Sequence, residues 1–432
     1  MNKTKVLIFP AGAENALEIY DALKDHIDID VYGASGKADY ASCLYPSDHY
    51  AEGEFYIETA GFLEYFNDFL DRWSIDIVIP THDEVALYFA RNRRLIQAAI
   101  LLAPLETAEI CREKRKTFQL FSDCNFCPTI WDTADILPET AYPVFSKPNI
   151  GVGARNTFLI NTPSELQSAL KKSANQQMII CEYLPGDECT VDCYTNSNRE
   201  LLFAGARIRN RIEHGIAYRS TTFAITEEIK EIAKTINGRL HFFGAWYFQV
   251  KRDYAQKWKL LEVSCRQSGG MTLYRHKGIN FPLMGIYELN GIPVDALEMP
   301  GEWMFERRLM TRFKLPYQFN TVYIDLDDTL ILNGNVNTTI MSFLYQCVNE
   351  KKEIILLTRH MAKPSSTLSK YKIDTTLFDR IVHITFHDEK ATYIRDKNAI
   401  FIDNSFAERK KVHEATGIPT FDVDDVDCLL YF

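Results

Sequence analysis

The sequence lacks several features that would decide its class at once. No apolar run approaches the roughly 18 residues that a membrane-spanning helix needs, so we expect no membrane partner. Basic residues are not in excess: 48 Lys and Arg stand against 58 Asp and Glu, a net charge of −10. This balance argues against a nucleic-acid partner, because phosphate backbones need a basic face. With no secretory signal, we expect a reducing, cytoplasmic location with free thiols.

Short metal- and nucleotide-binding motifs are scarce as well. Among the ten scattered cysteines, only Cys124 and Cys127 have metal-like spacing, and no second pair completes a zinc site. Gly12 does not begin a G-x-G-x-x-G fingerprint, and no G-x-x-x-x-G-K-[ST] loop occurs. The sequence therefore argues against a zinc centre, a dinucleotide site and a Walker-type phosphate loop.

The hydrophobic pattern predicts an α/β protein of three parts, 1–104, 105–318 and 319–432, because 432 residues exceed a single core. The first part alternates strand and helix patterns, which predicts a parallel sheet with helices on both faces. Ligands of such sheets lie at the carboxyl ends of the strands. Asp83 and Glu84 follow one of these ends. They are candidates for binding a second substrate, or caps of the next helix.

The middle part carries charged residues at predicted strand ends. Glu262 and Arg266 place a carboxylate and a guanidinium together after a strand, and Gln249 ends the strand before it. A carboxylate can hold Mg²⁺ between phosphates, and a guanidinium stabilises a transferring phosphoryl group. Further upstream, Lys147 ends a strand and precedes a small-residue loop over 150–155. Glycines in that loop would let the backbone approach phosphate oxygens.

In this order, the features resemble the ATP-grasp ligases of the carbamoyl-phosphate-synthase-like or carboxylate–amine ligase type, over about residues 105–290. The resemblance implies an α+β domain that uses ATP and Mg²⁺, small-molecule carboxylate and amine substrates, and compatibility with a homodimer. The loop 150–155 would be a lid. The nucleotide contacts that the resemblance implies are Lys114, Lys147, Gly151, Gly153, Glu182, Tyr183, Leu184 and Glu188; the metal ligands are Gln249, Glu262 and Ser264; the catalytic cations are Arg209, Arg211 and Arg266.

Alternatives remain open within this pattern. Lys114 lies in a helix predicted over 107–121, where Arg115 and Lys116 compete for the phosphate contact. The alternating arginines that end at Arg211 suit fixed cations at a phosphate or a solvated face. Ser264 stands where the family usually has Asn, which implies a weaker second Mg²⁺ site.

The last part places polar residues at the ends of successive hydrophobic strands. Asp325 and Asp327 follow the first strand, and they suit a nucleophile and a general acid–base with Mg²⁺ neutralising a phosphate. Thr358 could hold the phosphoryl group, Lys390 could shield its charge, and Asp403 could ligate the metal.

These motifs resemble the haloacid-dehalogenase-like (HAD) phosphatases over the last 110 or so residues. The resemblance implies a Rossmann-like fold, Mg²⁺ held by Asp325, Asp403 and the Asp327 carbonyl, and a phosphorylated metabolite as substrate. Asn404 replaces a second acid that the family commonly has. The gaps at 330–357 (28 residues) and 359–389 (31 residues) leave no room for a large cap.

The sequence thus predicts a bifunctional enzyme: an ADP-forming ligase that makes C–N bonds through an acyl phosphate, fused to a phosphomonoesterase. Two alternatives remain. The ATP-grasp part could bind nucleotide without catalysis beside an active phosphatase, or both sites could be degenerate in a scaffold.

Overall fold

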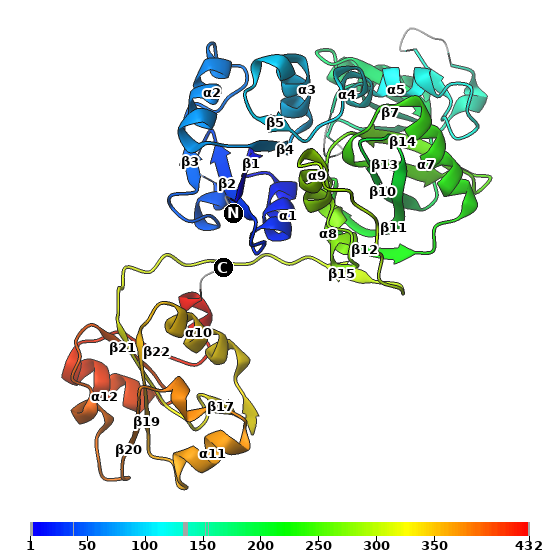
Figure 1. Ribbon diagram of the computed structural model, residues 1–432. Coiled ribbons are helices and arrows are strands. Elements are labelled where there is room, and N and C mark those ends of the chain that lie inside the picture. Colours follow the sequence, from blue (N-terminus) through cyan, green and yellow to red (C-terminus); the bar gives the residue numbers. More distant parts are fainter. Residues whose placement is uncertain (1–2, 38, 133–136, 152, 154, 431–432) are drawn as a thin grey trace. The chain divides into compact units, whose positions relative to one another are not determined.

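A computed structural model describes residues 3–37, 39–132, 137–151, 153 and 155–430. The chain divides into two compact units, Met1–Arg308 and Leu309–Phe432 (Figure 1). Among the helices of the described ranges, none is long and apolar enough to cross a bilayer. All ten cysteines are free thiols. The predicted boundaries near 104 and 318 stay predictions.

Unit 1 begins with a five-stranded parallel sheet in the order β3-β2-β1-β4-β5. Val6 and Ile8 pack in one core cluster with α1, whereas Leu7 and Phe9 pack in another with α2 and α3. Successive side chains of a strand point to opposite faces, so helices cover both sides of the sheet (Figure 1). The elements are β1 (Thr4–Phe9), α1 (Glu14–Leu23), β2 (Ile29–Ser35), β3 (Tyr50–Glu52), α2 (Phe62–Trp73), β4 (Ile77–Pro80), α3 (Asp83–Asn92) and β5 (Ala99–Ile100).

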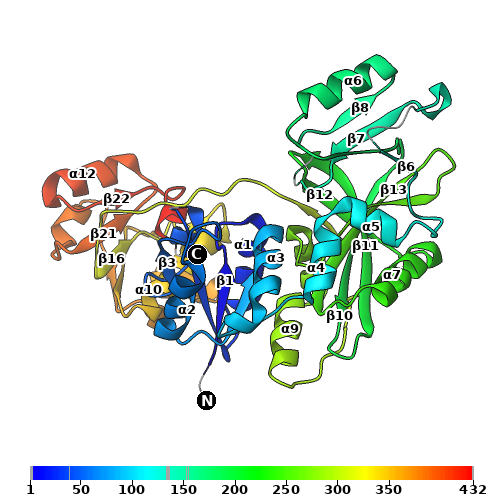
Figure 2. The same ribbon diagram turned by 90° about the horizontal axis from the view of Figure 1, so that it is seen from above.

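Two antiparallel sheets follow in unit 1, one of four strands (β6-β9-β7-β8) and one of six (β14-β13-β10-β11-β12-β15). Figure 2 shows α6 beside β7 and β8. The core cluster of Leu7 and Phe9 continues into Val191 and Phe248 of the six-stranded sheet, so the parallel sheet and this sheet share one core. The strands are β6 (Ile130–Trp131), β7 (Val144–Pro148), β8 (Phe158–Ile160), β9 (Met178–Glu182), β10 (Glu188–Thr195), β11 (Leu201–Glu213), β12 (Ile216–Phe223), β13 (Gly244–Arg252), β14 (Trp258–Ser264) and β15 (Met304–Glu306). The helices are α4 (Leu105–Arg112), α5 (Lys114–Leu120), α6 (Pro163–Lys172), α7 (Glu227–Arg239), α8 (Thr272–His276) and α9 (Phe281–Leu289).

The single helix predicted over 107–121 is wrong, because the chain breaks at Glu113 between α4 and α5. Glu113 has an extended backbone, with φ −110° and ψ 108°. The Lys114 N–H donates to the Asn149 carbonyl (3.1 Å), and the Arg115 N–H donates to Asn149 Oδ1 (2.9 Å). A loop distant in sequence therefore satisfies the first N–H groups of α5, which a helix start leaves without internal partners.

Unit 2 contains a five-stranded parallel sheet in the order β20-β19-β16-β21-β22. Val322 and Ile324 pack with Phe343 of α10, and Tyr323 packs with Val412 of α12. Between β16 and α10, the described residues form only a small hairpin of two strands, β17 and β18. The described structure therefore shows no cap domain in that segment. The elements are β16 (Thr321–Ile324), β17 (Ile331–Leu332), β18 (Asn335–Val336), α10 (Thr338–Asn349), β19 (Glu353–Thr358), α11 (Pro364–Lys370), β20 (Arg380–His383), β21 (Ala399–Ile402), α12 (Phe406–Thr416) and β22 (Thr420–Phe421).

Candidate active sites

A first cavity of about 220 Å³ in unit 1 is lined by strands of both antiparallel sheets. One part of its wall is apolar and includes Phe145, Leu184 and Leu260; the other is charged. Such a cavity can take a flat ring and a charged tail together. The structure brings all eight predicted nucleotide contacts to this wall: Lys114, Lys147, Gly151, Gly153, Glu182, Tyr183, Leu184 and Glu188. Their role as contacts stays a prediction.

Two lysines supply fixed positive charge in this cavity. Lys147 Nζ donates to the Leu261 carbonyl (2.9 Å) and lies 4.9 Å from the centre of the Phe118 ring. Lys114 Nζ lies 3.3 Å from the Gly151 carbonyl and 3.9 Å from Glu262 Oε2. Burial lowers the pKa of Lys114, although the Glu262 charge opposes this effect. Both ammonium groups are therefore positioned before any ligand arrives.

Two glutamates of the cavity are already hydrogen-bonded within the protein. Glu182 Oε1 accepts from the Thr129 N–H (3.0 Å), and Glu188 forms an ion pair with Arg209. The Lys251 ammonium lies 3.9 Å from Glu188. A carboxylate has several acceptor sites, so these bonds fix the two side chains and leave acceptor capacity for a ligand.

The glycine loop after Lys147 meets the turn between β11 and β12. A Cβ atom placed on Gly215 would lie 2.6 Å from the Gly153 backbone, and φ is +79° at Gly215 and +67° at Gly153. Only glycine adopts such angles and permits this approach at low cost. The loop also closes the β7–β8 hairpin. The predicted lid positions 152 and 154 lie outside the described residues.

A second cavity of about 230 Å³ adjoins the first and shares Lys114, Arg209, Gln249 and Glu262 with it. It is lined in addition by Glu14, the first residue of α1, and by Arg307, near the end of unit 1. The Arg307 guanidinium pairs with Glu14 and donates to the Gly269 carbonyl (2.5 Å). Residues from the two ends of unit 1 thus form one wall of the second cavity.

Asp83 and Arg266 form a bidentate ion pair at the second cavity, with N–O distances of 2.9 and 2.8 Å. Burial alone would raise the pKa of Asp83, but the Arg266 charge and hydrogen bonds outweigh it, and the net pKa is lowered. Burial alone would lower the pKa of Arg266, but the charge and hydrogen bonds of Asp83 outweigh it, and the net pKa is raised. Glu84 lines neither cavity and pairs with Arg112, its side chain 56% exposed. The sequence had not indicated that Asp83 holds Arg266.

The three alternating arginines of β11 have different surroundings. Arg207 is buried, pairs with Asp192 through N–O distances of 2.7 and 3.3 Å, and lines the second cavity. Arg209 lines both cavities. The strand register shifts between Arg209 and Arg211, and Arg211 points to solvent, where it pairs with Glu213 and Glu306. The structure therefore places Arg211 outside the site and adds Arg207, which the sequence analysis had not selected.

The predicted metal ligands of unit 1 fit a magnesium ion unequally. Gln249 and Glu262 are cross-strand partners on β13 and β14 and line both cavities. One carboxylate with an amide oxygen suits Mg²⁺, which takes its remaining ligands from phosphates and water. The Ser264 hydroxyl donates to Asp83 Oδ1 (3.1 Å) and keeps its oxygen lone pairs, so its role at a weaker second Mg²⁺ site stays a prediction. No group of three or more His, Cys, Asp or Glu in the described chain is placed to hold a metal.

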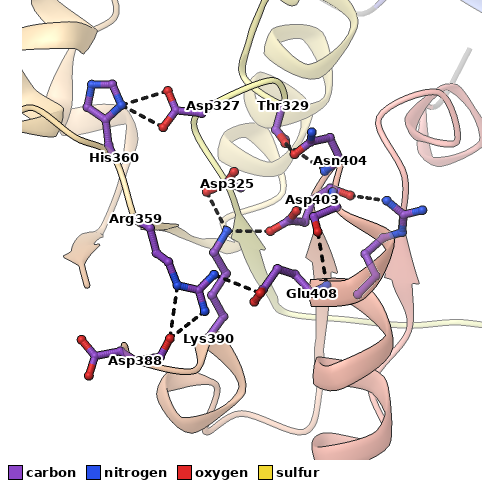
Figure 3. A network of polar contacts seen from close by, with 12 residues as sticks. Asp325, Asp327, Thr329, Arg359, His360, Asp388, Lys390, Asp403, Asn404 and Glu408 are labelled. Atoms are coloured by element: carbon purple, nitrogen blue, oxygen red, sulfur yellow. Dashed lines mark hydrogen bonds and ion pairs between the residues drawn. The ribbon is translucent and has the colours of Figure 1, made fainter. Parts of the chain in front are cut away.

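In unit 2, Lys390 joins two carboxylates at the end of the parallel sheet (Figure 3). Its Nζ lies 2.7 Å from Asp325 Oδ1 and 2.6 Å from Asp403 Oδ2. The two aspartates follow β16 and β21, which pair through Ile324 and Ile402. Burial raises the pKa of Asp325, and the Lys390 charge opposes this effect. Two neighbouring carboxylates can ligate a hard cation such as Mg²⁺.

Thr358 and Asp327 differ in burial and in hydrogen bonding. Thr358 ends β19, is fully buried, and its hydroxyl has no hydrogen-bond partner among the described residues. A buried polar atom without a partner is costly, so this hydroxyl fits a bound ligand. Asp327 is half exposed and pairs with His360, a residue that the sequence analysis had not selected. Asn404 contacts Thr329, whose Oγ1 accepts from the Asn404 N–H (3.1 Å).

Comparison with known proteins shows what unit 1 resembles. Residues 174–304 match a family described as ATP-grasp in the biosynthetic pathway with Ter operon. A biotin carboxylase–βγ-ATP complex from Campylobacter jejuni aligns with a TM-score of 0.58 and 14% identity, over 70% of this chain and 74% of that one. N5-carboxyaminoimidazole synthetase from Staphylococcus aureus complexed with ADP aligns with a TM-score of 0.58 and 13% identity, over 72% of this chain and 83% of that one. L-amino acid ligase from Bacillus licheniformis aligns with a TM-score of 0.52 and 18% identity, over 66% of this chain and 73% of that one.

Residues 174–304 thus match an ATP-grasp family, and the chain shares a mixed α/β fold with these structures. The HAD-like resemblance of unit 2 stays a prediction.

Proposed function

We propose that the protein is an ATP-dependent carboxylate–amine ligase joined to a Mg²⁺-dependent phosphatase. The observation that carries the ligase is the pair of adjoining cavities, which share fixed cations, Lys114 and Arg209, and the carboxylate Glu262. Two substrates bound on either side of such a junction could exchange a phosphoryl group. The proteins most similar in fold include two named as a synthetase and an amino acid ligase, which supports this reaction class.

In the proposed reaction, the first cavity binds ATP. Its apolar wall holds the base, while Lys114 and Lys147 bind phosphate oxygens through charge-assisted hydrogen bonds. Glu262 and Gln249 would hold Mg²⁺, which would supply positive charge against the polyphosphate.

The second cavity binds the carboxylate substrate. The carboxylate oxygen attacks the γ-phosphorus of ATP, the bond to the bridging oxygen breaks, and ADP leaves. Arg209 and Arg266 stabilise the charge on the transferring group. An amine then attacks the acyl phosphate, an amide forms, and phosphate leaves. Asp83 keeps Arg266 in place throughout, so little reorganisation accompanies the reaction.

The ligase proposal is tested by measuring ADP release from the full chain over pools of carboxylates and amines, such as amino acids and sugar acids. We expect ADP release to require both substrates and to fall at least about 100-fold in Glu262→Gln, the loss of roughly 2.7 kcal/mol of transition-state stabilisation. Glu231→Gln, at an exposed residue of α7 that lines neither cavity, is the matched control. ATP binding without substrate-dependent ADP release would contradict the ligase and favour a nucleotide-binding module, for which Ser264 in place of the usual Asn is the argument.

The phosphatase proposal is supported by the arrangement of Asp325, Lys390 and Asp403 and by the unpartnered hydroxyl of Thr358. Asp325 would attack the phosphorus, and Asp327 would protonate the leaving oxygen. Water then hydrolyses the aspartyl phosphate. Hydrolysis of p-nitrophenyl phosphate that disappears in Asp325→Asn would support it; equal rates in the two proteins would refute it.

A further inference from the structure

His360 forms a chain of hydrogen bonds that begins at the Asp327 carboxylate (Figure 3). Its Nδ1 lies 2.9 and 2.8 Å from the two Asp327 oxygens, and its Nε2 lies 2.6 Å from Thr367 Oγ1. Once Asp327 is ionised, its carboxylate only accepts hydrogen bonds, so Nδ1 carries the hydrogen in that state. The His360 side chain is only 14% exposed, whereas that of Asp327 is 53% exposed. The buried imidazole therefore fixes the exposed acid.

The backbone around His360 is held as well as its ring. His383 Nε2 donates to the His360 carbonyl (2.7 Å). The preceding residue, Arg359, donates to the Asp388 carbonyl (2.6 Å) and pairs with Glu408 of α12 (3.1 Å). Thr367 lies on α11. Because both the backbone and the ring are anchored, His360 has little freedom to follow a rotation of Asp327.

We propose that His360 is a positioning residue of the phosphatase, which holds Asp327 in the orientation from which it protonates the leaving group. The proposal rests on the phosphatase function above. In this step, Asp325 forms a bond to phosphorus, the ester P–O bond breaks, and the Asp327 proton passes to the ester oxygen. The Nδ1–H bond strengthens as Asp327 becomes an anion, so it stabilises the transition state more than the ground state.

The test compares two aryl phosphates that differ in how much their leaving groups need a proton. p-Nitrophenolate departs readily without one, whereas phenolate does not. We expect His360→Leu to lower kcat/KM for phenyl phosphate at least about 30-fold, within the range of general acid catalysis, and for p-nitrophenyl phosphate less than about 3-fold. The quantity kcat/KM reports the steps up to phosphoryl transfer, so later hydrolysis of the aspartyl phosphate does not obscure the difference. Asp327→Asn should show the same dependence on the leaving group.

Conservative variants separate positioning from a general loss of structure. His360→Asn places an amide donor near the position of Nδ1, and we expect it to stay within about 3-fold of wild type on both esters. His383→Gln, which alters only a contact to the His360 carbonyl, should change both esters equally if it changes either. Thermal unfolding of each variant checks its folding. If His360→Leu does not fold, Thr367→Val decides, because it removes the second anchor of the ring and should lower kcat/KM for phenyl phosphate selectively.

The outcomes are distinguishable. If wild type hydrolyses neither ester and so behaves like Asp325→Asn, the phosphatase function is refuted, and this inference with it. An active wild type whose His360→Leu variant loses both esters equally, or neither, would overturn the positioning role and leave the phosphatase intact.

Discussion

Replacing Asp83 by Asn tests how much the pair with Arg266 stabilises unit 1. The change removes the negative charge and leaves the guanidinium, 17% exposed, without its counter-ion. The Asn side chain has nearly the same volume, so packing is retained. Asp83 accepts from two guanidinium nitrogens and from the Ser264 hydroxyl. The substitution therefore weakens three hydrogen bonds at once.

The expected loss follows from the partial burial of this pair. Removing one partner of a fully buried pair costs about 3–5 kcal/mol, and a single hydrogen bond to a charged group contributes roughly 1.5–3 kcal/mol. Because both side chains of this pair keep about a fifth of their exposure, we expect the free energy of unfolding to fall by about 2–4 kcal/mol. Glu231→Gln is the matched control, since both side chains of its pair with Lys234 are exposed and the change should cost less than about 1 kcal/mol.

Tryptophan fluorescence during urea unfolding measures this loss in unit 1 alone, because all five tryptophans lie there. They are Trp73, Trp131, Trp246, Trp258 and Trp303. The pKa of Asp83 is lowered in the folded protein, so its contribution is complete above the unfolded pKa of about 3.9 and is lost as the pH falls through the lower folded value. The difference between wild type and Asp83→Asn should therefore be constant near neutral pH and shrink below about pH 4. A loss at pH 7 no larger than that of Glu231→Gln would refute the reasoning.

Three further substitutions address the binding sites. Lys147→Met should weaken binding of a fluorescent ATP analogue about 10- to 100-fold, because the cation above Phe118 is lost; unchanged affinity would contradict its phosphate role. Gly215→Ala adds a Cβ 2.6 Å from the Gly153 backbone at a φ of +79°, and should destabilise unit 1 by about 1–3 kcal/mol in urea unfolding and weaken nucleotide binding. Asp325→Asn should abolish aryl phosphate hydrolysis while ADP release stays at the wild-type rate, and a parallel loss of both would argue against separate sites.

Residues at strand ends were predictable from the sequence, whereas pairings between distant elements were not. Lys147 and Glu262 lie near the ends of clear strand patterns, and Asp403 follows one. In the parallel sheet, the carboxyl ends of neighbouring strands meet in space. Asp83 and Arg266 are 183 positions apart, and their contact depends on how two sheets pack. No pattern in a single sequence gives that packing.

Three local features of the structure also depend on contacts between distant elements. The helix break at Glu113 depends on Asn149, a residue of a loop after β7. Arg211 leaves the site because the strand register shifts beside it, which three alternating arginines cannot indicate. His360 was missed because a lone histidine after a strand carries no signal until Asp327 lies beside it.

The Glu14–Arg307 pair has a practical consequence for dividing the chain. Arg307 is three residues beyond the region that matches the ATP-grasp family, 174–304, yet it contributes to the wall of the second cavity. A fragment of unit 1 that ends at residue 304 would lose this arginine and leave Glu14 without its cation. Separate expression of the two units therefore calls for a cut after Arg308, at their junction.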